Sequence, residues 1–162
     1  LSASAVFAFN ERGVRTMAIR LPQVHGGEGK AGFIGYLFTV AKEKGVSAYV
    51  GDGSNRWSAA HRNDVARCYR LALEKGQAGK AYHAVADGAV PVRDLADVFA
   101  KILNVETKSL TQDEAGAHFG FMGMFAALDM PASSTKTQAE LGWTPKEIGV
   151  IEDLSRAGYF AS

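Results

Sequence analysis

The spacing of apolar side chains predicts three clear helices. In residues 33–44, 63–75 and 91–103 apolar residues recur every three or four positions, which is the period of a helix that buries one face. Residues 2–12 predict the end of another helix, which the following glycine caps. Residues 113–128 have a similar helical pattern, but glycines interrupt it.

Short runs of apolar and β-branched residues predict strands between these helices. They lie at residues 17–21, 47–50, 81–86 and 107–110, the last with the weakest pattern. Because strands alternate with helices and no segment repeats, the sequence predicts an α/β fold in a single domain over residues 1–162.

Composition and charge exclude several classes of protein. The 162 residues carry a formal net charge of +1, which gives no global field for binding nucleic acid or an anionic membrane surface. No apolar run reaches the roughly 18–20 residues that a membrane span needs. Cys68 is the only cysteine, so no internal disulfide can form, and a reducing cytoplasm is the simplest compartment. The chain begins at Leu1 on sequence typical of mid-helix, which indicates a fragment or a start further upstream.

Most candidates for ligand contact lie between Met17 and Asp64, where a glycine-rich loop occupies residues 22–32. Within this loop Gly27–Gly32 matches the G-x-G-x-x-G pattern of dinucleotide-binding loops, and Asp52 follows about 20 residues later. In a true fingerprint the first glycine ends the strand directly, so that the helix N-terminus meets the pyrophosphate, whereas five residues intervene here. We therefore favour a flexible glycine loop and keep the cofactor loop as the alternative.

The histidines of this region are weaker candidates. His25 and His61 have no companion cysteine or closely spaced histidine, so the sequence predicts no metal site. A lone loop histidine is more often a polar-contact residue than a catalyst. At the start of the predicted helix, His61 and Asp64 can form a structural hydrogen-bonded pair.

Surface charge or packing explains other candidate side chains, both inside and outside this region. Arg20, Arg56 and Arg62 can gather around an anion because guanidinium groups bind phosphate and carboxylate, but alone they are better explained as surface charge. Trp57 and Trp143 are predicted to be packing residues. No serine lies in a G-x-S-x-G elbow, so nothing supports a hydrolase.

Five segments together have a familiar order. They are Arg20–Gly26, Gly51–Trp57, His61–Ala66, Tyr82–Ala96 and Leu141–Pro145, the last of which reads L-G-W-T-P. This order resembles that of the extended short-chain dehydrogenases/reductases, the NAD-dependent epimerase/dehydratase family. The first segment is similar to the family's R-x-x-x-V-Y-G and the third to its V-H-V-x-D-V-A. Singly the matches are weak, but together they cover nearly the whole chain.

The resemblance implies the C-terminal part of a Rossmann-like parallel sheet with a smaller mixed α/β substrate lobe. The family's cofactor fingerprint belongs to an N-terminal half that is absent here, and its Tyr-x-x-x-Lys dyad would precede Leu1. In the family that tyrosine is the general acid/base, and NAD or NADP transfers the hydride. No tyrosine of this chain has a lysine four residues later, so we assign no catalytic residue.

The resemblance also implies contacts to cofactor and substrate. Three residues match the loop that lies along the nicotinamide: Pro22, Gln23 and Val24. Arg56 matches an arginine that often contacts a substrate phosphate, and His61 matches a position that shapes the substrate lobe. His25, also predicted to contact substrate, stands where the family has tyrosine. Residues 26–33 depart from the family's G-P pattern, so a nucleotide-sugar substrate is not implied.

We therefore interpret the chain as the C-terminal, substrate-lobe portion of an NAD(P)-dependent epimerase/dehydratase-like oxidoreductase, inactive on its own. Its expected partners are a small-molecule substrate and, because half a Rossmann sheet leaves an unpaired strand edge, a second copy or an N-terminal half. A rival hypothesis is a stand-alone binding or assembly module that retains the fold without catalysis. A second rival takes the Gly27–Gly32 loop at face value as a nucleotide site.

Overall fold

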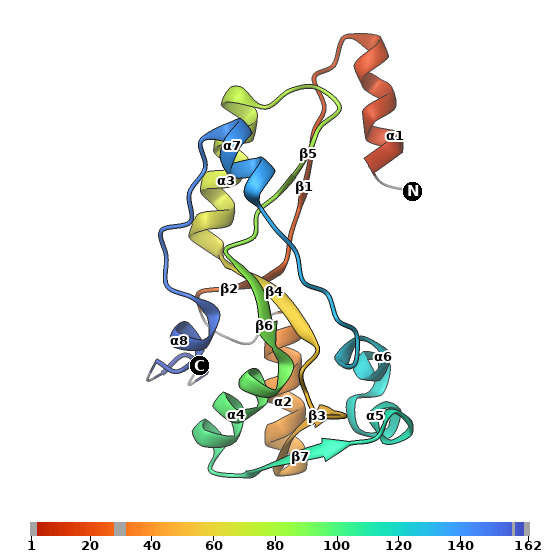
Figure 1. Ribbon diagram of the computed structural model, residues 1–162, viewed down its shortest axis with the longest axis vertical. Coiled ribbons are helices and arrows are strands. Elements are labelled where there is room, and N and C mark those ends of the chain that lie inside the picture. The colour runs from red at the N-terminus through yellow and green to blue at the C-terminus, as the bar shows by residue number, and fades with distance from the viewer. Residues whose placement is uncertain (1–2, 28–31, 157, 161–162) are drawn as a thin grey trace.

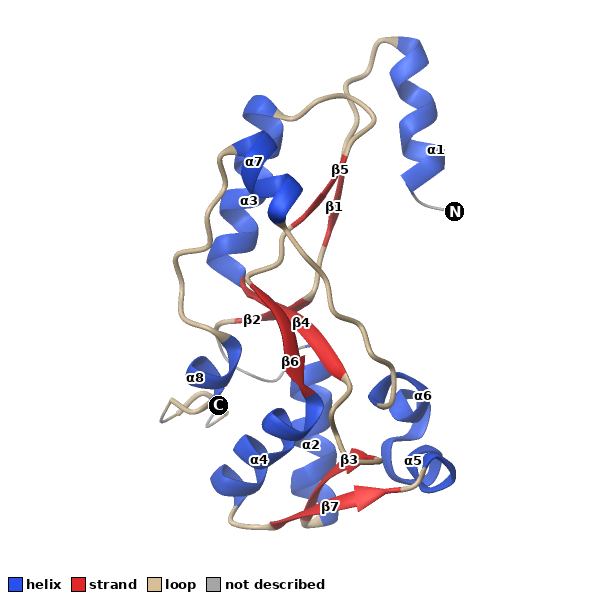
Figure 2. Cartoon of the chain, viewed as in Figure 1, coloured by secondary structure: helices blue, strands red, loops and turns tan. Residues whose placement is uncertain are grey.

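The computed structural model describes residues 3–27, 32–156 and 158–160. Figure 1 shows an elongated body in which small sheets follow one another along the long axis, with helices packed beside them. Figure 2 shows the same arrangement by secondary structure. The alternation of helices and strands confirms the predicted α/β class.

The first sheet pairs β1 (Ala18–Arg20) with β5 (Ala81–His83) in parallel. Helices α3 (Arg62–Lys75) and α7 (Thr135–Leu141) pack beside it and bury a cluster of apolar side chains. The buried members are Ala60, Val65, Cys68, Ala72, Tyr82, Ala84, Leu141 and Trp143. Trp143 also donates its indole N–H to the backbone oxygen of Asp64, which fixes the segment after α7 against the start of α3.

The second sheet has the order β2-β4-β6 and forms the middle of the body. Its strands are β2 (Gln23–His25), β4 (Arg56–His61) and β6 (Asp87–Pro91). Strand β2 runs parallel to β4, whereas β6 runs antiparallel to it. Residues 57–60 of the central strand are all buried, because neighbouring elements cover both faces of β4.

The third sheet pairs β3 (Val46–Val50) with β7 (Glu106–Leu110) in parallel. Helices α2 (Gly32–Lys44) and α4 (Val92–Leu103) pack near it, and both contact β3. A broken helical segment follows β7, made of α5 (Gln112–Phe119), η2 (Gly120–Met122) and α6 (Gly123–Ala126). The largest core cluster joins these elements to Trp57, whose side chain is 1% exposed.

The two ends of the described chain differ in their packing. Helix α1 (Ala3–Phe7) and the 3-10 turn η1 (Ala8–Arg12) stand apart from the sheets at one end of the body. Gly13 follows in the left-handed conformation with φ 78°, which confirms the predicted glycine cap. At the other end of the sequence α8 (Val150–Leu154) returns to the middle sheet and packs beside it.

Three strand assignments from the sequence are wrong. Residues 23–25 were expected in a loop but form β2, a strand too short to show alternation. Strand β4 was missed because its four consecutive buried residues include two alanines and a serine rather than a periodic apolar pattern. Strand β6 was missed because it contains a glycine and ends at Pro91. The predicted helices at 33–44, 63–75 and 91–103 are confirmed to within two residues.

Candidate functional site

The carboxyl ends of β2 and β4 lie together and form the first half of the candidate site. The two strands are parallel, and the register places His25 opposite His61 at the last position of each strand. Ligands of open α/β sheets bind at the carboxyl ends of parallel strands. The structure therefore brings together two of the three residues that the sequence proposed for substrate contact.

His25 is buried and paired with a carboxylate. Its Nδ1 lies 2.7 Å from Oδ2 of Asp153, and the side chains are 0% and 6% exposed. In a neutral imidazole this contact places the hydrogen on Nδ1, where it is donated to the carboxylate, and leaves Nε2 as an acceptor. Among the described residues Nε2 has no hydrogen-bond partner. The ring therefore has a fixed orientation and one unused acceptor.

His61 lies against His25, with ring centroids 5.4 Å apart and planes at 82°. Its Nδ1 accepts a hydrogen bond from the backbone N–H of Asn63, so His61 caps α3. Gly26 has φ 95° and lies so close to the His61 ring that a Cβ would overlap with Nε2. Only glycine allows the chain to leave β2 at this point.

Tyr159 binds the backbone at the end of β2 from the C-terminal segment. Its hydroxyl accepts the backbone N–H of Gly26 at 3.0 Å. Burial disfavours the phenolate and raises the pKa of Tyr159 above its ordinary value. Together with the contact of Asp153 to His25, this hydrogen bond anchors the end of β2 to the segment around α8.

A pocket of about 440 Å³ opens at this end of β2. The three residues predicted to lie along a nicotinamide all line it, together with Leu21, His25, Gly26, Gly32, Phe33 and Arg62. The walls are thus largely apolar, with one guanidinium at the side. Of the proposed Gly27–Gly32 nucleotide loop, residues 28–31 lie outside the described residues.

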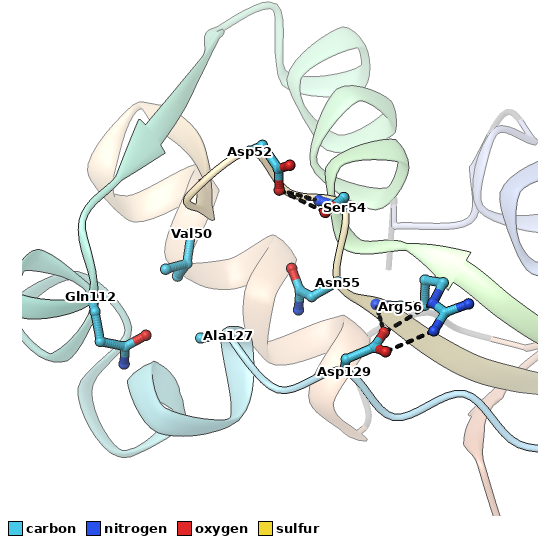
Figure 3. Close-up of a pocket in the computed structure, with 8 residues that line it drawn as sticks. All are labelled: Val50, Asp52, Ser54, Asn55, Arg56, Gln112, Ala127 and Asp129. Atoms are coloured by element: carbon cyan, nitrogen blue, oxygen red, sulfur yellow. Dashed lines mark hydrogen bonds and ion pairs between the residues drawn. The ribbon is translucent and has the colours of Figure 1, made fainter.

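Arg56 lies at the opposite end of β4, in a different pocket. Since β4 has six residues, its first and last positions are roughly 16 Å apart. This second pocket, of about 580 Å³, is shown in Figure 3. Its lining residues are Val50, Asp52, Ser54, Asn55, Arg56, Gln112, Ala127 and Asp129. The structure therefore separates Arg56 from His25 and His61.

The Arg56 guanidinium is bound by Asp129. Arg56 donates from Nε to Oδ1 at 3.0 Å and from Nη2 to Oδ2 at 2.7 Å. These hydrogen bonds lower the pKa of the Asp129 carboxyl and raise the pKa of Arg56. In the same pocket Asp52 accepts from the backbone N–H and hydroxyl of Ser54, which lowers the pKa of Asp52. Both carboxylates of the pocket are thus held in their charged form.

The structure forms neither of two polar clusters that the sequence left open. Asp64 does not pair with His61 but is fully buried. Its carboxylate accepts hydrogen bonds from the backbone N–H groups of Lys146 and Glu147, in the segment after Trp143. It also forms an ion pair with Arg67. The three arginines do not gather around one anion. Arg20 lies on β1, whereas Arg56 and Arg62 lie near opposite ends of β4.

Sequence reasoning missed residues that support or line the two pockets. Asp153 and Tyr159 hold two lining residues of the first pocket, His25 and Gly26, and Asp129 lines the second. Asp153 is 128 residues from its partner and Asp129 is 73 residues from its partner, so no local pattern indicates either contact. Within the described ranges, no three His, Cys, Asp or Glu side chains are grouped as a metal site would require.

A family model described as the NAD dependent epimerase/dehydratase family matches residues 2–86, just over half of the chain. The chain belongs to this family. The family predicted from the sequence motifs is therefore confirmed.

Two curated relatives extend the similarity beyond residue 86. The uncharacterized protein YLL056C of Saccharomyces cerevisiae is 42% identical over 159 residues, which are 98% of this chain and 53% of that protein. The uncharacterized protein C2A9.02 of Schizosaccharomyces pombe is 44% identical over 152 residues, which are 94% of this chain and 52% of that protein. The chain thus spans about half the length of the curated relatives it matches.

Solved structures show the same fold. The dTDP-glucose 4,6-dehydratase DesIV of Streptomyces venezuelae, with NAD bound, matches with a TM-score of 0.73 at 21% identity over 98% of this chain and 48% of that one. The epimerase Mth375 of Methanothermobacter thermautotrophicus matches with a TM-score of 0.74 at 17% identity over 98% of this chain and 47% of that one. These matches confirm the Rossmann-like epimerase/dehydratase fold.

No helix among the described residues combines the length and the apolar character needed to cross a membrane.

Proposed function

We propose that this chain is the C-terminal, substrate-lobe portion of an NAD(P)-dependent oxidoreductase of the epimerase/dehydratase family. The observation that carries the proposal is the pocket at the carboxyl end of β2, because Pro22, Gln23 and Val24 all line it. Family membership and the Rossmann-like fold support the same conclusion.

The residues of this pocket fit a nicotinamide cofactor. Leu21, Pro22, Val24 and Phe33 give it apolar walls, which suit a flat ring, and a volume of about 440 Å³ lies in the range of small-molecule sites. The buried Nε2 of His25 is an acceptor without a partner in the described ranges, which a polar ligand group can satisfy. When bound, NAD or NADP supplies hydride transfer.

The role of this chain is to bind and position. Asp153 holds the His25 ring, and Tyr159 holds the backbone at Gly26, so two contacts from the C-terminal segment stabilise one wall of the pocket. No Tyr-x-x-x-Lys dyad occurs in the sequence. We therefore assign proton transfer to a part of the protein outside these residues, and we expect the chain alone to be inactive.

A partner surface lies at the first sheet. Within the described residues β1 pairs only with β5, so one edge of β1 has no neighbouring strand. Large apolar side chains are exposed on and near the N-terminal elements, namely Val6, Phe9, Val14 and Leu21. We propose that an N-terminal half or a second copy of the chain covers this edge and these side chains. Monomeric, well-folded behaviour in light scattering would count against this proposal.

The proposed compartment is the cytoplasm. The single cysteine, Cys68, is buried and has no partner for an internal disulfide. A domain without disulfides suits a reducing environment.

The proposed cofactor site can be tested in a complemented protein. We would co-express this chain with the remainder of YLL056C, purify the complex, and titrate it with NADH and NADPH. Val24→Glu introduces a charge into the pocket wall and should weaken cofactor binding at least tenfold, because the dinucleotide is anionic. Met124→Glu is the matched control, since Met124 is exposed on α6 and lies outside both the pocket and the proposed partner surface.

Cofactor titration of the same complex and its variants distinguishes the proposal from the rival hypotheses. Equal cofactor affinity for Val24→Glu and the unchanged protein would contradict the proposed cofactor site. A stand-alone binding or assembly module predicts no cofactor binding by any of these proteins. The nucleotide-loop hypothesis predicts that replacing Gly29 with a bulky residue abolishes nucleotide affinity while Val24→Glu does not.

A further inference from the structure

The pocket at the start of β4 contains one cationic side chain and two carboxylates. Arg56 is the cation, and Asp52 and Asp129 are the acids among its lining residues. Figure 3 shows Arg56 and Asp129 turned toward one another at one side of the pocket, with Asp52 on the turn above. The formal charge of the lining is therefore negative, which disfavours an anionic ligand.

Asp129 uses two of the five N–H donors of Arg56 and neutralises its charge. The guanidinium presents Nε and Nη2 as a fork, and Asp129 accepts from both, at 3.0 and 2.7 Å. Phosphate and carboxylate groups bind guanidinium through such paired donors. A phosphate on Arg56 would therefore have to displace the Asp129 carboxylate or lie beside its charge.

The position of Asp129 is supported by hydrogen bonds of its carboxylate and of the neighbouring backbone. Its Oδ1 also accepts the backbone N–H of Arg56 at 2.7 Å. The carbonyl of Leu128 accepts from Asn55 Nδ2 at 3.1 Å and from the buried Trp57 indole at 3.2 Å. Met130 donates its N–H to the carbonyl of Arg56 at 2.6 Å. Rotating the Asp129 carboxylate away from Arg56 would therefore also break its hydrogen bond to the backbone of β4.

A nearby cation does not supply the missing charge. Arg93 favours the charged form of Asp52, but its guanidinium lies 5.4 Å from the Tyr49 ring centroid and its Nε lies 3.9 Å from Asp97. Arg93 does not line the pocket. The Asn55 Nδ2 donates to the carbonyls of Ala126 and Leu128, so the lining groups with capacity left include the Asp52 carboxylate, the Asn55 Oδ1 and the Gln112 amide.

We infer that Asp129 is a specificity-determining residue, which neutralises the charge of Arg56 so that this pocket rejects phosphate-bearing ligands. The inference rests on the proposed function in treating this pocket as part of the substrate site.

The test is calorimetric titration of the purified chain with inorganic pyrophosphate. Asp129→Asn removes the competing charge and should raise pyrophosphate affinity at least tenfold, which corresponds to about 1.4 kcal/mol. Adding Arg56→Gln to Asp129→Asn should abolish the gain, because the guanidinium is then absent. Asp52→Asn is the matched control, since it removes one carboxylate of the same pocket that does not bind Arg56, and should give a smaller gain.

If Asp129→Asn fails to fold, Arg56→Gln as the only substitution still tests the inference. Arg56→Gln alone should leave pyrophosphate binding unchanged, because Asp129 already neutralises the charge of Arg56. The inference is overturned if the unchanged chain binds pyrophosphate as tightly as Asp129→Asn, or if Arg56→Gln alone weakens binding tenfold. The titration uses no nicotinamide cofactor, so its result is independent of the cofactor test on Val24.

Discussion

Nδ1 of His25 lies 2.7 Å from Oδ2 of Asp153, although the two residues are 128 positions apart in the sequence. The contact joins the last residue of β2 to α8 and is almost fully buried. Because β2 also supplies the wall of the proposed cofactor pocket, the geometry of that wall depends on the C-terminal segment. Stability and ligand binding are therefore expected to respond together when this pair is broken.

Asp153→Ala should destabilise the chain by about 3 kcal/mol, because it leaves the His25 Nδ1 buried without an acceptor. The measurement is urea denaturation followed by circular dichroism. Glu152→Ala is the matched control, because Glu152 is exposed on the same helix and should change the free energy of unfolding by less than about 0.5 kcal/mol. Equal effects of the two substitutions would show that the buried pair does not stabilise the fold.

Asp64→Ala should release the segment that follows Trp143. The Asp64 carboxylate is fully buried and accepts the N–H groups of Lys146 and Glu147, and its loss also leaves Arg67 without this partner. We expect a loss of roughly 3–5 kcal/mol, as for other broken buried ion pairs. Trp143 fluorescence should shift to longer wavelength because the indole becomes hydrated.

The control for Asp64 is Asp94→Ala. Asp94 also lies in the first turn of a helix, but its side chain is exposed. Its replacement should cost only the weak interaction of a carboxylate with the helix N-terminus, about 0.3–1 kcal/mol. An unchanged emission spectrum for Asp64→Ala would contradict the role given to its carboxylate.

Ionisation of the buried Cys68 thiol should lower the stability of the chain at high pH. Burial raises the pKa of its thiol from 9.0 to about 11, because the thiolate is disfavoured inside the core. An unfolded chain ionises its thiol near pH 9, so this contribution to stability is complete below pH 9 and declines as the pH rises toward 11. The total decline should be about 2–3 kcal/mol.

The measurement is the free energy of unfolding from pH 8 to 11 for the unchanged chain and for Cys68→Ala. The substitution should cost stability at every pH but should remove the part of the slope that belongs to the thiol. Parallel pH profiles would show that Cys68 ionises as easily in the folded chain as in the unfolded one. The comparison is needed because lysine and tyrosine side chains also titrate in this range.

The local spacing of apolar residues is sufficient to predict the amphipathic helices, but it does not predict the strands of the middle sheet. In α4 the buried Leu95, Ala96 and Phe99 follow the helical period, so the sequence predicts this helix and its buried face. In β4 the buried run is Trp-Ser-Ala-Ala, whose residues share no apolar periodicity. Burial of that strand comes from its neighbours, which the local sequence does not encode.

Some residues of the candidate site could likewise be predicted from the sequence, whereas others could not. Motif resemblance indicated Pro22, Gln23 and Val24, and these residues do line one pocket together. The same reasoning grouped Arg56 with His61, but the length of β4 separates them. Asp129 and Asp153 could not be found from sequence spacing, because each acts through a contact formed only when distant segments pack together.

The cofactor affinity of this chain, alone and in complex with the remainder of YLL056C, is best measured by titration with NADH and NADPH. If the cofactor site needs an N-terminal half, the chain alone should bind more weakly than about 1 mM (roughly −4 kcal/mol), and the complex should bind at least tenfold more tightly. Binding by the chain alone with an affinity tighter than about 1 mM would show that no second half is needed, and the Gly27–Gly32 loop would then be the leading cofactor site.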